Sequence, residues 1–243
     1  MGNLFSDSVF LSVVIPAFNE EKKIEEDLVL LFGYLNQKQF KSEVIVVDDG
    51  SRDKTFEILK NLESKYKNLR GIHYDQNRGK GYAVKTGILQ SQGEYILFAD
   101  AGSCVPYSDL EEGLKLLYDG FDVAIGSRAL DNSEIIKKQP TYRVIGSRVF
   151  SIIVHSVMGL PHIKDTQCGF KLFKRQAADQ IFSRNKIDGF MFDIETLLNA
   201  KRLGFKLKEF PISWKNDPDT RFHPFGGSFR IMKELMKIKF GRG

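Results

Sequence analysis

The stretch EVIVVDDGS, residues 43–51, decides the fold class because it joins a buried strand to a polar turn. Its run of Val and Ile has no polar alternation, which is typical of a strand covered on both faces in a parallel sheet. The turn ends the strand, and apolar side chains then recur at Phe56, Leu59 and Leu62. This spacing predicts a helix, which Ser51 or Asp53 can cap.

Similar strand and helix patterns occur along the rest of the chain. We expect further strands at residues 11–16, 69–74, 94–99, 121–125, 166–173 and 205–212. Helical spacing occurs at residues 20–35, 79–90, 191–203 and 229–240. Strands joined through helices imply right-handed crossovers, so the predicted fold class is α/β, a mostly parallel sheet flanked by helices. We find no linker and no repeat, and expect residues 1–243 to form a single domain with a C-terminal elaboration.

The composition is that of a globular protein with a preference for anionic partners. Of its 243 residues, 42% are hydrophobic and 28% charged, which excludes global disorder. Two cysteines and four scattered histidines provide neither a disulfide framework nor zinc-site spacing. No apolar run approaches the roughly 18–20 residues of a membrane span. The net charge of +5 favours phosphate-bearing partners, while the lack of a nucleic-acid-binding motif argues against nucleic acid.

Polar residues follow the first two predicted strands, at the edge where open α/β sheets bind ligands. The segment PAFNE, residues 16–20, ends the first strand, and Asp48 and Asp49 end the second. Asn19 and Glu20 can contact a ribose or base, but they also suit a helix N-terminus. A turn accounts for only one of the two adjacent carboxylates. Because two buried carboxylates repel each other, the presence of both favours a functional role.

Two further clusters carry charge. In NRGKG, residues 77–81, two glycines surround Lys80 at a predicted helix start, which indicates an anion-binding turn, with a solvated turn as the alternative. Asp100 ends the fourth strand, where a carboxylate suits a divalent cation that bridges phosphates.

The second half of the chain adds two polar segments. Asp165–Lys171 places polar groups before a strand, and Asp193 and Glu195 lie in a predicted helix. Consecutive helical residues are about 100° apart, so these two carboxylates point to different faces. We expect only one of them to enter a site, and the other to be solvated or paired with a basic residue.

The order of these segments resembles a known family. The stretches VVIPAFNEE, VIVVDDGSRDKT, NRGKGYAVKTG and YILFADA are similar to family-2 glycosyltransferases of the GT-A fold, which is Rossmann-like. DTQCGFKLF and GFMFDIE, in the second half, resemble the dolichyl-phosphate β-glucosyltransferases, with dolichyl-phosphate mannosyltransferases second. The resemblance covers roughly residues 10–240.

This resemblance implies an inverting transfer of a hexose, with glucose from UDP-glucose favoured over mannose from GDP-mannose, to a polyprenyl or dolichyl phosphate. Residues 10–130 would form the nucleotide-sugar half and residues 131–243 the acceptor half. Two alternatives remain open at this point. One is a family-2 enzyme that extends a glycan, and the other is a pseudoenzyme that binds a sugar nucleotide.

The resemblance also implies roles for single residues. The nucleoside would be held by Pro16, Ala17, Asn19, Glu20, Asp48 and Asp49, and the turn of Gly79, Lys80 and Gly81 would lie near the donor. Asp100 would face ribose or metal. Asp165, Gln167 and Lys171 would contact the sugar or the acceptor phosphate, and Arg128 matches a basic position in the same family. Asp193 would occupy the position of the catalytic base, and would orient the acceptor if that acceptor is already an anionic phosphate.

One departure concerns the metal. The family pattern reads FADADG at residues 98–103, whereas this chain reads FADAGS, so Gly102 replaces the second acid. Mg²⁺ or Mn²⁺ would then be held by Asp100, water and the donor diphosphate. The alternatives are that basic residues such as Lys80 supply the charge, or that activity is reduced or lost.

A lipid acceptor requires access to a membrane. The apolar stretch Val149–Met158 and the basic helix at residues 229–240 can lie in a membrane interface, with Lys233, Lys237 and Lys239 facing anionic headgroups. Both segments can equally be core helices. The sequence therefore predicts a cytoplasmic protein, either free or peripheral at the cytoplasmic face of a membrane.

Overall fold

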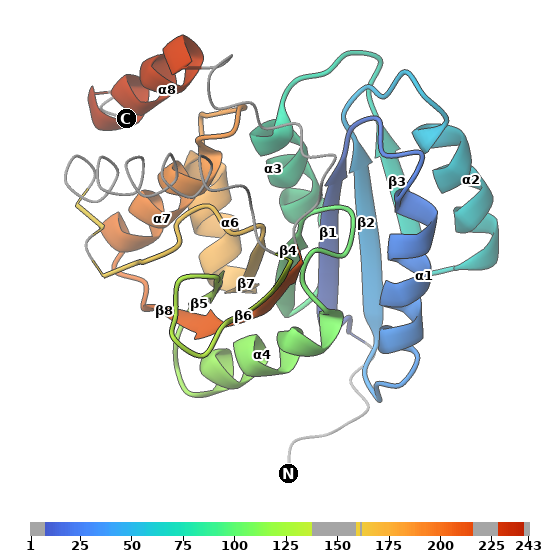
Figure 1. The fold of residues 1–243 in the computed structure, drawn as a ribbon, viewed down its shortest axis with the longest axis horizontal. Coiled ribbons are helices and arrows are strands. Elements are labelled where there is room, and N and C mark those ends of the chain that lie inside the picture. The colour runs from blue at the N-terminus through green and yellow to red at the C-terminus, as the bar shows by residue number, and fades with distance from the viewer. Residues whose placement is uncertain (1–7, 138–158, 161, 216–227, 241–243) are drawn as a thin grey trace.

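The computed structural model describes residues 8–137, 159–160, 162–215 and 228–240, in which a seven-stranded sheet lies between two layers of helices (Figure 1). Every neighbouring pair of strands is parallel except those of β7, which runs antiparallel to β4 and β5. The expected α/β class with a mostly parallel sheet is confirmed. In spatial order the strands are β3 (Leu69–His73), β2 (Ser42–Asp48), β1 (Leu11–Ala17), β4 (Tyr95–Ala99), β7 (Phe170–Lys174), β5 (Val123–Ser127) and β8 (Leu207–Pro211).

Helices cover both faces of the sheet. On one face lie α1 (Ile24–Leu35), α2 (Thr55–Lys65), a 3₁₀ turn η1 (Tyr107–Asp109) and α4 (Leu110–Tyr118). On the other face lie α3 (Lys80–Gln90), α6 (Arg175–Arg184), α7 (Phe192–Arg202) and α8 (Ser228–Phe240). A separate two-stranded parallel sheet pairs β6 (Glu134–Lys137) with β9 (Ser213–Lys215). Helices α4 and α6 have no counterpart among the elements expected from the sequence.

Strand β1 shows why the apolar runs predict a sheet covered on both sides. Val13 and Ile15 pack into the core beneath α1 and α2, while Val14, between them, packs into the core beneath α3. All three side chains are fully buried. Burying each such side chain contributes roughly 1.5–3 kcal/mol, so both faces of the sheet stabilise the fold.

The turns after β1 and β2 differ from the expected capping. Helix α1 begins at Ile24, so Asn19 is not its cap; Asn19 instead has φ +54° and accepts a hydrogen bond from the Arg52 amide at 2.7 Å. Asp53, one of the two expected caps of α2, accepts the Thr55 amide at 3.0 Å. Ser51 is used elsewhere, because its hydroxyl accepts the Asn19 amide at 2.7 Å.

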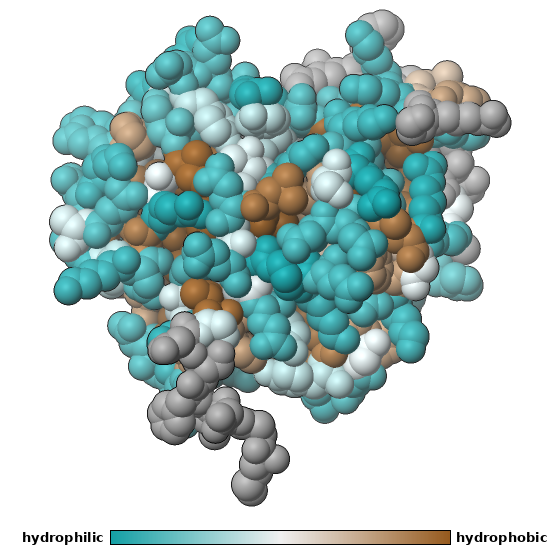
Figure 2. All heavy atoms as spheres, turned by 180° about the vertical axis from the view of Figure 1, so that it is seen from behind, coloured by the Kyte–Doolittle hydropathy of each residue, from teal (hydrophilic) through white to brown (hydrophobic). Residues whose placement is uncertain are grey.

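Helix α8 confirms the expected helix at residues 229–240, and it packs against the sheet's α3 side through Leu235 and Ile238. The stretch Val149–Met158 lies outside the described residues. Among the residues that the structure describes, no helix is both long and apolar enough to cross a membrane. Seen from behind, hydrophilic side chains cover most of the surface, and hydrophobic ones show only in small patches between them (Figure 2).

Candidate active site

The topology brings the polar segments of both halves of the chain to one edge of the sheet. The parallel strands β1, β2 and β4 all end there. Because β7 is antiparallel, it begins at the edge where β4 ends, and Ala99 pairs with Phe170. The Asp100 amide donates to the Gly169 carbonyl oxygen at 2.8 Å, which ties the two segments together. A single antiparallel strand therefore brings the DTQCG segment to Asp100.

Four charged side chains meet at this edge as two ion pairs. Lys80 Nζ lies 2.7 Å from Asp100 Oδ1, and both side chains are partly exposed. Lys171 Nζ lies 2.5 Å from Asp193 Oδ1, and this inner pair is almost wholly buried, with 1% and 4% of the side chains exposed. The inner pair therefore forms the floor of the site, and the outer pair can meet a ligand.

The two pairs influence each other's protonation. Burial lowers the pKa of the Lys80 ammonium, but Asp100 and Asp193 outweigh it and hold that pKa above its ordinary value. Burial raises the pKa of Asp193, and the nearby ammonium groups of Lys171 and Lys80 offset part of the rise. Lys80 is therefore a cation at neutral pH, available to a negatively charged leaving group.

The aromatic ring of Phe98 lies below both lysines. Lys80 Nζ is 5.5 Å and Lys171 Nζ 5.8 Å from the ring centroid. Phe192, which immediately precedes Asp193, packs edge-on against Phe98 with centroids 5.6 Å apart. Cation–π attraction and aromatic packing therefore place both lysines over an apolar base.

A third ion pair joins Arg128 to Asp165 in a bidentate arrangement. Arg128 Nε donates to Asp165 Oδ2 at 2.7 Å and Nη2 to Oδ1 at 2.8 Å, and the guanidinium lies 5.4 Å from the Trp214 ring. Although burial raises the pKa of Asp165, Arg128 outweighs this effect and lowers it below its ordinary value. Asp165 thus orients Arg128, whose side chain is 30% exposed. Gln167, on the same segment, is half-buried.

Asp48 and Asp49 are buried supports for the neighbouring turns. Asp48 accepts the Ser51 amide at 3.1 Å and lies 2.8 Å from His73 Nδ1. Asp49 accepts the amides of Arg78 and Gly79, each at 2.8 Å. Burial raises the pKa of Asp49, and these amides offset part of the rise. Asp48 and Asp49 thus tie together three turns around the site, and their contact with a nucleoside stays a prediction.

The turn at the start of α3, predicted to bind an anion, has four backbone N–H groups with protein partners. Those of residues 78 and 79 donate to Asp49, and those of Gly81 and Tyr82 donate to the Asp188 carbonyl oxygen, so anion binding there stays a prediction that depends on Lys80. Gly79 has φ +111°, and a Cβ at Gly81 would lie 2.5 Å from the Ile187 carbonyl oxygen. The glycines serve this close packing, and Lys80 is the group that the turn offers to a ligand.

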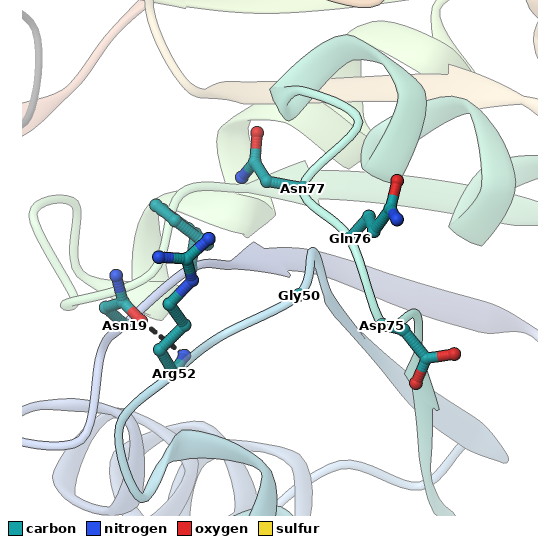
Figure 3. A pocket seen from close by; sticks show the side chains of 7 residues that line it. Asn19, Gly50, Arg52, Asp75, Gln76 and Asn77 are labelled. Carbon is teal, nitrogen blue, oxygen red and sulfur yellow. Dashed lines mark hydrogen bonds between the residues drawn. The ribbon is translucent and has the colours of Figure 1, made fainter.

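A pocket of about 470 Å³ opens beside these turns (Figure 3). Asn19 and Arg52 form one side of it and Gln76 and Asn77 another, with Gly50 between. The remaining lining residues are Phe18 and Asp75. Of the residues expected to hold a nucleoside, Asn19 lines this pocket, and Ala17 is buried in β1. Pro16 lies in β1, and the Glu20 amide is held by the Thr55 hydroxyl at 2.7 Å.

The turn that carries Gly102 is held by Asp27, a buried residue of α1 that the sequence analysis missed. Asp27 accepts the Gly102 amide at 2.8 Å, the Tyr107 hydroxyl at 2.7 Å and the Ser103 hydroxyl. Burial raises the pKa of Asp27, and these donors offset part of the rise. The available signal was a lone carboxylate on the apolar face of a predicted helix. Within the described residues, no group of three or more potential ligands could hold a metal ion.

Asp193 and Glu195 point to different places, as expected. Asp193 joins the ion pairs, whereas Glu195 accepts the backbone amides of Lys186 and Ile187. The expectation that the second carboxylate is solvated or paired with a basic side chain is wrong. Glu195 is buried, and it shapes the loop that precedes α7.

Comparison with known proteins identifies the family. The family described as Glycosyl transferase family 2 matches residues 12–182, more than half of the chain. The chain belongs to this family. The family-2 match makes it a glycosyltransferase, with the α/β sheet of the GT-A fold described above.

Relatives of this family-2 glycosyltransferase span nearly all of the chain. A dolichyl-phosphate beta-glucosyltransferase of Homo sapiens is 36% identical over 242 residues, which cover 94% of this chain and 74% of the human protein. The Saccharomyces cerevisiae protein of the same name is 36% identical over 251 residues, covering 96% and 75% of the two chains. The similarity to these relatives therefore extends beyond residues 12–182, which the family model matches.

Solved structures support the same fold. Glucosyl-3-phosphoglycerate synthase from Mycobacterium tuberculosis, in complex with Mn²⁺, uridine-diphosphate-glucose and phosphoglyceric acid, has a TM-score of 0.72 and 18% sequence identity. The alignment covers 97% of this chain and 81% of that chain. The likeness supports the GT-A fold for the residues that the structure describes, on both sides of residue 130.

Proposed function

We propose that this protein transfers glucose from UDP-glucose to a dolichyl or related polyprenyl phosphate. The names of its relatives support this acceptor and this sugar. The observation that carries the proposal is the set of three ion pairs around one edge of the sheet: Lys80–Asp100, Lys171–Asp193 and Arg128–Asp165. Two cations that are partly exposed, Lys80 and Arg128, suit a reaction in which both leaving group and acceptor are phosphates.

The 470 Å³ pocket is our candidate for the uridine. Phe18 offers a ring face, and Asn19 and Asn77 offer amide groups to a base and a ribose. The pocket wall ends at Asn77, three residues before Lys80 in the chain. A nucleoside bound there would direct its diphosphate towards Lys80 and Asp100.

The residues fit a divalent cation that is shared between one carboxylate and the donor. Asp100 would be the protein ligand, since Gly102 offers none and its amide is held by Asp27. Mg²⁺ is often bound by one or two carboxylates together with substrate phosphates. Such a cation would neutralise charge on the diphosphate, and Lys80, 2.7 Å from Asp100, would add a fixed positive charge beside it.

The transfer then follows from the acceptor's charge. A lipid monophosphate, whose second pKa is near 6, is already largely dianionic at pH 7. Its oxygen attacks the anomeric carbon, the bond from that carbon to the UDP oxygen breaks, and the electron pair leaves with UDP. Arg128 would hold the acceptor phosphate, and Asp193, buried with Lys171 beneath the site, would orient it through the neighbouring lysines without removing a proton. Lys171 is fully buried against Asp193, so we assign it a positioning role.

We infer that α8 binds the surface of the membrane that contains the acceptor. Lys233, Lys237 and Lys239 are exposed on this helix together with Met236 and Phe240. Lysines and apolar side chains on one helix surface are typical of a helix that lies on anionic lipid. This arrangement supports a protein that is peripheral at a membrane surface.

Transfer of labelled sugar tests the proposal directly. UDP-glucose and GDP-mannose are supplied in parallel with dolichyl phosphate in detergent, with Mg²⁺, Mn²⁺ or EDTA, and the organic phase is counted. We expect label only from UDP-glucose, and a large loss of signal in EDTA. Label from GDP-mannose would contradict the proposed donor, and label in a glycan product would contradict the proposed acceptor. Tight UDP-glucose binding without any transfer would favour a pseudoenzyme. This is the second candidate function, because Gly102 replaces the second acid of the family pattern.

A further inference from the structure

The loop at residues 186–191, between α6 and α7, contacts both halves of the candidate active site. The Asp188 carbonyl oxygen accepts the amides of Gly81 at 2.8 Å and Tyr82 at 3.2 Å, so the loop fixes the turn that carries Lys80. Its last residue, Met191, is followed directly by Phe192 and Asp193, the first turn of α7. A displacement of this loop would therefore move both ion pairs.

The same loop is held from its outer side by α8. Glu234 Oε2 accepts the Met191 amide at 3.2 Å, and a Cβ placed on Gly189 would lie 2.1 Å from Glu234 Oε1. Lys237 Nζ donates to the Lys186 carbonyl oxygen at 3.4 Å. Glu234 is the sole acidic residue in the sequence of α8, SFRIMKELMKIKF. The single carboxylate of this basic helix thus faces the loop at residues 186–191.

The outward side of the same two segments is apolar and basic. Met236 and Phe240 on α8 are 51% and 62% exposed, and Phe190, within the loop itself, is 41% exposed. On α8 the exposed lysines lie on the same side of the helix as Met236 and Phe240, while Leu235 and Ile238 anchor the opposite side in the core. In Figure 1, α8 lies at the outer edge of the molecule, beyond α7. Its positive charge matches an anionic lipid surface, which we take as the occupant of this face.

We propose that Glu234 is a positioning residue that couples α8 to the active site, so that binding of α8 and Phe190 to anionic lipid raises the turnover number. A lipid surface shifts the equilibrium between arrangements of the loop at residues 186–191 only if it binds one arrangement better than another. In this proposal Phe190 supplies the difference, because it belongs to the loop and is 41% exposed while Glu234 holds the Met191 amide. The inference rests on the proposed function for its acceptor, but the linkage itself can be measured without it.

The kinetic test uses two variants that disturb the same contact from opposite sides. Glu234→Gln weakens the acceptor of the Met191 amide, and Gly189→Ala inserts a methyl group against the carboxylate. Transfer from UDP-glucose to a short-chain, water-soluble polyprenyl phosphate is followed with and without phosphatidylserine-containing vesicles. We expect vesicles to raise the wild-type kcat about threefold or more. Both variants should lower kcat at least about fivefold, leave KM for UDP-glucose within about twofold and lose the response to vesicles.

Three controls keep the test decisive. Glu112→Gln, an identical exchange on the exposed side of α4, should behave as wild type. Both variants should still sediment with the vesicles, since the lysines remain. Wild-type kcat that does not respond to vesicles, or variants that keep the full response, would overturn the proposal.

Hydrogen exchange separates this proposal from the proposed function. In Glu234→Gln we expect faster exchange at the Met191 amide and, through Asp188, at the amides of Gly81 and Tyr82. Vesicles should slow exchange at these amides in the wild type. If the wild type transfers no sugar to any polyprenyl phosphate, the proposed function fails, and the exchange data alone decide the linkage. Unchanged exchange at Gly81 and Tyr82 in the variant would overturn it.

Discussion

Gly169 leaves no space for a side chain because the carboxylate of Asp100 occupies it. A Cβ on Gly169 would lie 2.1 Å from both Cγ and Oδ2 of Asp100. The amide of Asp100 is also bonded to the carbonyl oxygen of Gly169. Gly169 therefore determines the position of the Asp100 carboxylate in its ion pair with Lys80.

Gly169→Ala should separate activity from stability. The methyl group would push the Asp100 carboxylate away from Lys80, so we expect kcat/KM for UDP-glucose to fall at least about tenfold, a loss of about 1.4 kcal/mol in transition-state stabilisation. Unfolding should change little, since Asp100 is partly exposed and can rotate. Steady-state kinetics and urea unfolding measure the two effects.

Gly33→Ala is the matched control, because a Cβ there meets nothing within 4 Å. Gly33 lies in α1, where alanine is the better helix former by up to about 1 kcal/mol. This control should keep full activity and unfold at slightly higher urea. Equal activity in the two variants would refute the steric role of Gly169.

Arg128→Gln should change how stability depends on pH. In the wild type, Arg128 lowers the pKa of Asp165, so their pair stabilises the fold above the unfolded pKa near 3.9 and is lost as pH falls through the folded value. In the variant, the buried carboxylate loses the guanidinium and keeps the backbone amide of residue 128 at 3.0 Å, so its pKa rises and stability falls as pH increases above about 4. At pH 7 the free energy of unfolding should fall by about 3 kcal/mol, which is the lower end of the range for breaking a buried ion pair, because Arg128 is partly exposed.

Urea unfolding at several pH values between about 4 and 8 measures this dependence. Arg202→Gln, on the exposed end of α7, should reproduce the wild-type curve. A constant difference between Arg128→Gln and wild type over this range would contradict the assigned pair.

Asp193→Asn tests how the acceptor is activated. If the acceptor is a phosphate dianion, no proton is removed, and we expect kcat to fall only about tenfold through lost orientation. A loss above about a hundredfold would indicate a hydroxyl acceptor and a true general base. The acid side of the wild-type pH profile should lie above the ordinary Asp range, because burial raises the pKa of Asp193. In the variant, the part of the acid limb due to Asp193 should be lost, and only that of the acceptor phosphate, near its second pKa of about 6, should remain.

Periodicity and strand-end chemistry were enough to predict the sheet and much of the edge where the ion pairs meet. They worked for β2 and for the position of Asp100 at the end of β4, because local pattern fixes each of these. The role of Asp193 came from the family resemblance and stays a prediction. They failed where a partner lies far along the chain. Asp27 holds the Gly102 amide across 75 residues, and no local pattern marks that contact. The amides of Gly81 and Tyr82 form an anion site in isolation, and only the tertiary fold gives them Asp188 as a partner.

Gly102→Asp would restore the acid of the family pattern, but the backbone should resist it. Gly102 has φ +99° and Ser103 has φ +48°, so the turn already holds two left-handed residues. A side chain at φ +99° should cost about 1–2 kcal/mol. The new carboxylate would also lie near Asp27, whose Oδ2 is 2.8 Å from the Gly102 amide nitrogen. We therefore expect no gain in Mn²⁺ affinity.

Gly102→Ala is the matched variant, since it carries the same backbone cost without charge. Both variants should unfold at lower urea than wild type, and both should need at least as much Mn²⁺ for half-maximal transfer. If Gly102→Asp needed clearly less Mn²⁺ than Gly102→Ala, the turn would be free to rebuild a two-acid site. Asp27 would then not hold the turn as tightly as its three hydrogen bonds indicate.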